Sequence, residues 1–265
     1  MKTRILSAVI MLPLLTLVVF GGRPLLIACF IIGVMGVREF YQGFEKINIK
    51  PSYRVANLSI LGLYAVNLFA PDEIHYYMFW LFAVVILSLI YLFNIENREL
   101  NDAMATLTGI FYVVFLSFHV TLVDQTGEYG ILVWLIFITA FGTDSMAYFA
   151  GYAFGRHKLA PKISPKKTIE GSVGGIVGSV LFCGIFGYFV IPQLFIHCII
   201  IGILGGIISQ LGDLTASIFK RKMGIKDFGN LIPGHGGILD RFDSVLFTAP
   251  MVYYYIVLVI SQSVL

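Results

Sequence analysis

The stretch SIFKRKMGIKDFGNLIPGHGGILDRFD, residues 217–243, places acids, bases and glycines between two apolar segments. Asp240 and Asp243 lie three positions apart and share one face if a helix begins near Leu239. Clustered carboxylates repel one another unless a proton or a cation intervenes. Such oxygen ligands suit Mg²⁺, which takes one or two carboxylates together with substrate phosphates. The stretch therefore predicts a site for phosphate and a divalent metal.

Two further acids occupy positions where a charge is costly. Asp144 lies inside the apolar run WLIFITAFGTDSMAYFAGYAFG. Asp213 ends another apolar run, at helical spacing with Ser209, Ser217 and Lys220. A charge within a bilayer costs at least about 2.5 kcal/mol on insertion scales and normally faces a bundle interior, a cavity or a partner. We expect an ion-binding or other functional role for Asp144, with a buried structural pair as the alternative.

The basic residues and glycines of the same regions suit phosphate. Lysines supply point charges and arginines supply guanidinium forks. The sequence PGHGG at 233–237 leaves backbone N–H groups unshielded before a helix start, an arrangement that can receive an anion. No P-loop sequence occurs, and taken alone these glycines would more often form a hinge. Within PGHGG, His235 could be a general acid, a phosphate donor or a structural loop residue. Ser164, Thr168 and Glu170 are residue types found at helix starts, where they would cap and position a helix rather than touch a substrate.

The elements that must hold these residues are membrane helices. Of 265 residues, 58% are hydrophobic and 12% are charged, whereas about a quarter of the residues of a soluble domain are charged. Because a spanning helix needs about 20 apolar residues, we predict an all-α polytopic integral membrane protein with about nine transmembrane helices and a cytosol-facing polar active-site cavity. The nine runs are 5–21, 24–42, 54–70, 74–93, 105–123, 130–153, 173–191, 194–212 and 244–262.

The distribution of charge predicts an orientation. With the N-terminus inside, every lysine and arginine except Arg23 falls in segments on the cytosolic side. We therefore expect N-terminal helices over 1–125, with about five spans, and a catalytic half over 126–265 whose loops 154–172 and 213–243 face the cytosol. These domains form one membrane unit. The net charge of +3 is what topology signals alone can produce, so no nucleic-acid partner is expected.

Small residues within the apolar runs are predicted to serve packing. The glycine runs 171–179 and 202–212 suit close helix contacts, either within one chain or in a homodimer. Cys29, Cys183 and Cys198 lie in apolar runs and are expected to be buried rather than paired or bound to metal.

Residues 217–243 resemble the C-terminal signature of the phosphatidate cytidylyltransferase family, also called CDP-diacylglycerol synthases. DSMAYFAG from Asp144, SPKKTIEG from Ser164 and GDLTAS from Gly212 resemble further motifs of this family. The likeness covers the C-terminal half in ordered motifs and the N-terminal half as a hydropathy pattern. It implies transfer of a cytidylyl group from CTP to phosphatidic acid, with Mg²⁺ as cofactor, in a bacterial inner membrane.

The resemblance also implies roles for individual residues. Asp213 and Asp240 would bind metal, with Asp144 and Asp243 as further ligands or neighbours of ligands, for one Mg²⁺ or for two about 4 Å apart. The implied catalytic residues are Asp213, Asp240, Lys167 and His235. The implied substrate-binding residues are Ser164, Lys166, Lys167, Thr168, Ser217, Lys220, Arg221, Lys226, Asp227, Gly234, Gly236, Gly237 and Arg241.

Two other classes of membrane protein share some of these features. A secondary transporter of an anionic or phosphorylated solute would also hold charges within its spans, but near the midplane and with an inverted repeat. The sequence shows no convincing repeat, and its charges cluster on one face. A CDP-alcohol phosphotransferase would carry D-x-x-D-G-x-x-A-R, which does not occur here. A polyprenyl-phosphate sugar transferase would share acids and Mg²⁺.

Overall fold

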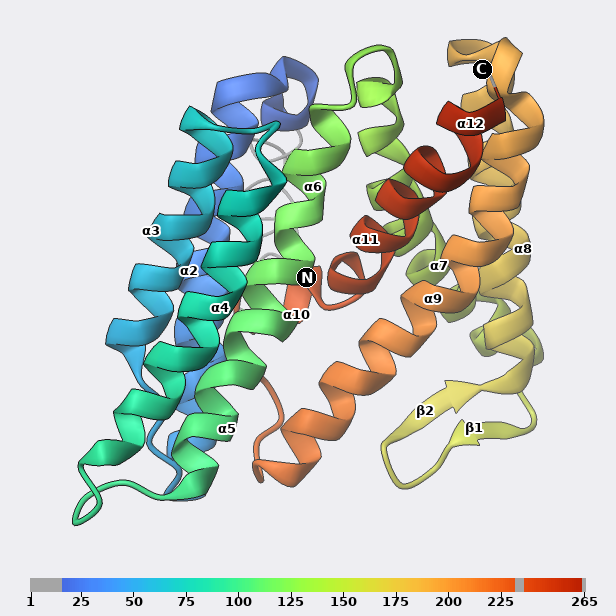
Figure 1. The fold of residues 1–265 in the computed structure, drawn as a ribbon. Helices are drawn as coiled ribbons and strands as arrows, with labels where there is room; N and C mark the ends of the chain where they lie inside the picture. Colours follow the sequence, from blue (N-terminus) through green and yellow to red (C-terminus); the bar gives the residue numbers. More distant parts are fainter. Residues whose placement is uncertain (1–15, 232–235, 264–265) are drawn as a thin grey trace. The chain divides into compact units, whose positions relative to one another are not determined.

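The computed structural model describes residues 16–231 and 236–263, most of them helical (Figure 1). The chain forms two compact units. Unit 1 combines Leu26–Phe118 with Lys222–Arg241. Unit 2 combines His119–Arg221 with Phe242–Leu265 and a short segment before residue 26. The polar stretch 217–243 is therefore shared between the two units, and most of it belongs with the N-terminal helices.

Within the described residues, six helical segments are long and apolar enough to cross a membrane. The chain is therefore an all-α polytopic integral membrane protein. The six segments are α2 (Gly22–Glu45); α4 (Ile74–Ile90) with η1 (Tyr91–Phe93); α5 (Leu100–Gly109), η2 (Ile110–Phe115) and α6 (Leu116–Asp124); η3 (Gly127–Leu132) with α7 (Val133–Phe154); α8 (Ile169–Val190); and η4 (Pro192–Leu194) with α9 (Phe195–Lys222).

Two more of the predicted runs are helical but shorter. Helix α3 (Tyr53–Phe69) has 17 residues, and α11 (Val245–Tyr255) continues through η5 (Ile256–Ile260) into α12 (Ser261–Ser263). The first predicted run, 5–21, lies mostly outside the described residues. The count of nine spans therefore stays a prediction.

A β-hairpin was not expected from the sequence. Strand β1 (Lys158–Ala160) pairs antiparallel with β2 (Ser164–Thr168), with Lys158 opposite Thr168 and Ala160 opposite Ser164. The hairpin occupies the predicted loop between α7 and α8 (Figure 1). Strand β1 has only three residues, KLA, and β2 is mostly polar, SPKKT, so the alternating apolar pattern that identifies a strand is absent.

Unit 1 is held by aromatic side chains against small or polar neighbours. The fully buried ring of Tyr41 on α2 lies over Gly109 of α5, where a Cβ atom would overlap the ring. The Tyr41 hydroxyl donates to the carbonyl oxygen of Thr106 at 2.7 Å. On the next pair of helices, Trp80 Nε1 of α4 donates to the carbonyl oxygen of Ser59 of α3, also at 2.7 Å. These contacts join α2 to α5 and α3 to α4 within the unit.

Glycines bring the helices of unit 2 into close contact, as the sequence predicts. A Cβ on Gly174 of α8 would overlap Ala150 of α7, and one on Gly202 of α9 would lie 2.9 Å from Val180 of α8. Both glycine runs thus pack within one chain. All three cysteines are buried, as predicted.

The helical boundaries near the acids differ partly from expectation. Helix α9 continues beyond the predicted end at 212 as far as Lys222. Helix α10 (Leu239–Phe242) begins at Leu239, as predicted, but ends at Phe242. Asp243 and Ser244 form a turn before α11. The prediction that Asp240 and Asp243 share one face of a helix is therefore wrong, because α10 ends at Phe242 and Asp243 lies in the turn that follows it.

Candidate functional site

Three acids from distant parts of the sequence gather in unit 2, and we call Asp144, Asp213 and Asp243 the carboxylate cluster. Asp144 comes from α7, Asp213 from α9 and Asp243 from the turn before α11. Ser244 links two of them, since its Oγ donates to Asp144 Oδ2 at 3.4 Å and its backbone N–H donates to Asp243 Oδ1 at 2.8 Å. These three acids therefore lie near one another within unit 2.

Gly212 allows α9 to approach the turn that carries Asp243. A Cβ atom at Gly212 would lie 2.9 Å from the carbonyl oxygen of Asp243 and 3.2 Å from the Phe247 side chain. A larger residue would push α9 away from this backbone. The glycine that precedes Asp213 thus brings Asp213 to Asp243.

Electrostatics in the cluster favour a cation. The Asp243 side chain is buried, and burial beside Asp213 and Asp144 raises its pKa to about 8, whereas Lys220 acts in the opposite direction. No group of three or more His, Cys, Asp or Glu residues is arranged to hold a metal within the part of the chain that the structure describes. Mg²⁺, however, requires only one or two carboxylates when phosphates complete its coordination. The donor set of the cluster therefore fits Mg²⁺ in the presence of a phosphate ligand.

Lys167 neutralises part of the negative charge of the carboxylate cluster. Its Nζ forms an ion pair with Asp213 Oδ2, and the two side chains are 26% and 24% exposed. Because side chains alternate along a strand, Lys166 on β2 points to the opposite face, where it is exposed. The end of α9 also reaches the hairpin, since Arg221 Nε donates to the carbonyl oxygen of Ile163 at 3.2 Å. Cations of the hairpin and of α9 thus lie beside the acids of the same unit.

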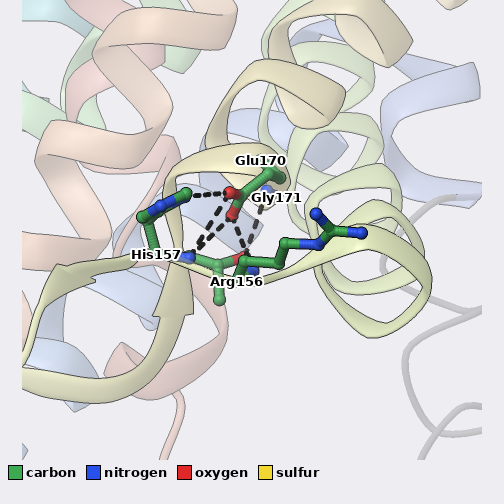
Figure 2. A network of polar contacts seen from close by, with 5 residues as sticks. Arg156, His157, Glu170 and Gly171 are labelled. Carbon is green, nitrogen blue, oxygen red and sulfur yellow. Dashed lines mark hydrogen bonds and ion pairs between the residues drawn. The ribbon is translucent and has the colours of Figure 1, made fainter.

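The hairpin is anchored at the start of α8. Thr168 is the N-cap residue, and its Oγ1 accepts the backbone N–H of Gly171 at 3.1 Å. The Glu170 carboxylate accepts the backbone N–H of Arg156 at 3.0 Å and contacts Nδ1 of His157 at 2.7 Å (Figure 2). The capping alternative that the sequence offered for Thr168 is thereby confirmed. These contacts set the position of β2 and hence of Lys167.

Two other acids, Glu39 and Asp240, lie buried in unit 1, and we call this pair the carboxylate clamp. Asp240 Oδ2 accepts the backbone N–H groups of Phe228 at 2.8 Å and Gly237 at 3.0 Å. Glu39 accepts the N–H of Ile238 at Oε1, at 3.0 Å, and the N–H of Leu239 at Oε2, at 2.8 Å. The clamp holds the two described ends of the loop that precedes α10.

Sequence reasoning missed Glu39. The signal was available, because Glu39 is a carboxylate inside the apolar run 24–42, just as Asp144 is inside its own run. Its partners could not be found in the same way, since they lie about 200 positions further along the chain. The sequence therefore identifies such an acid as unusual but does not say what it binds.

The remaining predicted residues are placed as follows. The Nε of Arg241 is buried and has no hydrogen-bond partner among the described residues, which leaves a donor for a ligand. In unit 1, Lys226 and Asp227 are exposed and Gly236 has a φ of +84°, a left-handed conformation that favours glycine. Ser164, Ser217 and Lys220 are half-buried in unit 2. Gly234 and His235 lie outside the described residues.

Comparison with known proteins agrees with the resemblance in the motifs. Residues 2–259 match the model of the cytidylyltransferase family. The chain is similar to the phosphatidate cytidylyltransferase of Bacillus subtilis (strain 168), with 34% identity over 97% of this chain and 98% of the relative. It is also similar to the phosphatidate cytidylyltransferase of Synechocystis sp., with 36% identity over 97% of each chain. Both alignments extend well beyond the C-terminal motifs and cover the N-terminal helices.

Proposed function

Because the chain belongs to the cytidylyltransferase family, we propose that it transfers the cytidylyl group of CTP to phosphatidic acid, producing CDP-diacylglycerol and pyrophosphate. The observation that carries the proposal is full-length similarity to two proteins named phosphatidate cytidylyltransferase. The carboxylate cluster and Lys167 support it, because nucleotidyl transfer requires groups that bind and neutralise phosphates. Neither of these two relatives is named as a transporter.

In the proposed reaction, an oxygen of the phosphatidate headgroup attacks the α-phosphorus of CTP. A bond forms between these two atoms, and the bond from the α-phosphorus to the bridging oxygen breaks, so that this oxygen leaves with pyrophosphate. The phosphatidate oxygen is ionised near neutral pH and needs no strong base. The chain mainly orients the two substrates in line and stabilises charge.

The acids would hold the metal and the bases would hold the phosphates. Bound Mg²⁺ would supply positive charge to the phosphates of CTP; Asp213 and Asp240 are the ligands implied by the family motifs, and Asp144 and Asp243 are further ligands or neighbours of ligands. Lys167 exchanges its ion pair with Asp213 for a phosphate oxygen, and the Nε of Arg241 donates to another. Other contacts to the two substrates are assigned to Lys166, Lys220, Arg221 and Lys226.

The location of the two substrates follows from their solubility. CTP is a polyanion that arrives from the cytosol, whereas phosphatidic acid stays in the bilayer and presents its headgroup at the surface. We therefore place the hairpin and the end of α9 at the cytosolic face of a bacterial inner membrane, with the N-terminus also in the cytosol. The excess of basic residues in these segments supports this orientation.

The proposed activity can be tested with purified protein in detergent. CTP labelled at the α-phosphate is incubated with phosphatidic acid and Mg²⁺, and we expect the label in lipid together with an equal amount of pyrophosphate. Omission of phosphatidic acid and addition of EDTA serve as the two controls, and each should abolish lipid labelling. If the wild-type protein labels no lipid, but reconstituted vesicles accumulate labelled solute, the protein is a transporter and the proposal is wrong.

A further inference from the structure

The clamp residue Glu39 has an environment that the proposed reaction does not yet explain. Its side chain, on α2, is 8% exposed, although a buried carboxylate is costly unless hydrogen bonds replace its water. Both of its oxygens accept backbone N–H groups, from Ile238 and Leu239. These two N–H groups stand at the start of α10, where the first N–H groups of a helix lack a partner within the helix. Glu39 therefore fixes the point at which α10 begins.

The backbone around Glu39 leaves room for this carboxylate and for no additional side chain. A Cβ on Gly229 would lie 2.5 Å from Glu39 Oε1, and one on Gly237 would overlap both carboxylate oxygens. A Cβ on Gly236 would likewise lie 2.7 Å from Asp240 Oδ2. Three glycines of unit 1 are thus built closely around the two acids of the clamp. A side chain at any of these glycines would force the backbone or the carboxylate to move.

The residues that Glu39 holds are adjacent to residues of the proposed reaction. Leu239, whose N–H it accepts, is followed directly by Asp240 and Arg241. Asp240 accepts the N–H of Gly237, and Gly237 is next to Ile238, the other residue bound by Glu39. A shift of this backbone would therefore move a proposed metal ligand and a proposed phosphate donor together.

We propose that Glu39 is a positioning residue for the cytidylyl transfer, acting through the backbone of residues 237–239 on Asp240 and Arg241. This inference rests on the proposed function. It goes further by assigning a role to an acid of the N-terminal helices, which lies outside all the motifs of the C-terminal half.

The first test is Glu39→Gln, with Glu45→Gln as the matched control. Glutamine keeps the size of the side chain but has one acceptor oxygen in place of two, so its NH₂ group faces an N–H donor. Glu45 lies on the same helix and is exposed, where it accepts a hydrogen bond from the Tyr53 hydroxyl. We expect Glu39→Gln to lower kcat by about 10-fold to 100-fold, the range found when a residue that orients a ligand is changed. The KM for CTP should change much less, and Glu45→Gln should leave both constants within about twofold.

A second readout does not depend on activity. Amide hydrogen exchange of peptides that cover 236–242 should become faster in Glu39→Gln and stay unchanged in Glu45→Gln, because only the first variant leaves one of the N–H groups of Ile238 and Leu239 without its acceptor. Exchange elsewhere in α2 should stay as in the wild type. Unchanged exchange over 236–242, or an unchanged kcat in folded Glu39→Gln protein, would overturn the proposal.

A double-mutant cycle covers the case in which Glu39→Gln also lowers overall stability. Gly237→Ala displaces the same carboxylate from the other side of the contact. If both changes act through this contact, the double variant loses kcat by little more than the stronger single variant. If the losses multiply, the proposal fails. Inactivity of the wild-type protein towards CTP and phosphatidic acid would instead refute the proposed function, and the exchange data would still show whether Glu39 orders this backbone.

Discussion

The carboxylate cluster of unit 2 and the carboxylate clamp of unit 1 use the same functional group in opposite ways. In the clamp, each acid accepts two backbone N–H groups, so its charge is satisfied by the chain itself. In the cluster, burial and neighbouring acids raise the pKa of Asp243, and a lysine pairs with Asp213. Acids that bind backbone fix a loop, whereas acids that face one another attract a cation.

Asp240 and Asp243 show this difference most directly. They are three positions apart in the sequence, yet the described partners of Asp240 lie in unit 1 and the charged neighbours of Asp243 lie in unit 2. Proximity in sequence therefore does not give two acids the same role. Substitutions that remove charge but keep shape can separate the roles.

The largest effect is expected for Asp213→Asn. This change removes a charge from the cluster and the partner of Lys167, so we expect cytidylyl transfer to fall by about 1,000-fold, as when a group that stabilises transition-state charge is lost. The measurement is lipid labelling per amount of folded protein. Asp72→Asn, in an exposed turn after α3, is the matched control and should keep wild-type activity. Activity within twofold of the wild type in Asp213→Asn would remove this acid from the proposed site.

Asp240→Asn tests whether the clamp acid is also a metal ligand. Asparagine retains one oxygen that can accept the N–H groups of both Phe228 and Gly237, so the loop should keep its hydrogen bonds. If Asp240 binds Mg²⁺ as proposed, activity falls by about 100-fold and is partly restored at higher Mg²⁺ concentration. Near-normal activity in the purified variant would show that Asp240 serves the clamp alone.

A smaller effect is expected for Lys167→Met. The change removes the cation beside Asp213 and with it one proposed contact to a CTP phosphate. A hydrogen bond to a charged group is worth about 1.5–3 kcal/mol, so we expect kcat/KM for CTP to fall by about 10-fold to 100-fold. Lys158→Met, at an exposed position on β1 of the same hairpin, is the control for charge alone and should stay within twofold. Equal losses in both variants would assign the effect to the general charge of the hairpin.

Much of the fold could be predicted because the signals are local. Apolar runs of sufficient length predicted the helices, and the glycine runs predicted close helix contacts, of which Gly174 against Ala150 is one. The start of α10 at Leu239 and the N-cap at Thr168 also followed from local patterns. The hairpin could not be found, because its short strands carry no alternating apolar pattern.

The sequence by itself determined that the chain spans a membrane, which acids are too costly to be incidental, and which family its motifs resemble. Only the tertiary structure decided what each acid touches. The approach of Asp213 to Asp243 depends on the absence of a side chain at Gly212. The capture of the start of α10 by Glu39 joins residues about 200 positions apart. Such contacts depend on how whole helices pack, and no local pattern of residues specifies them.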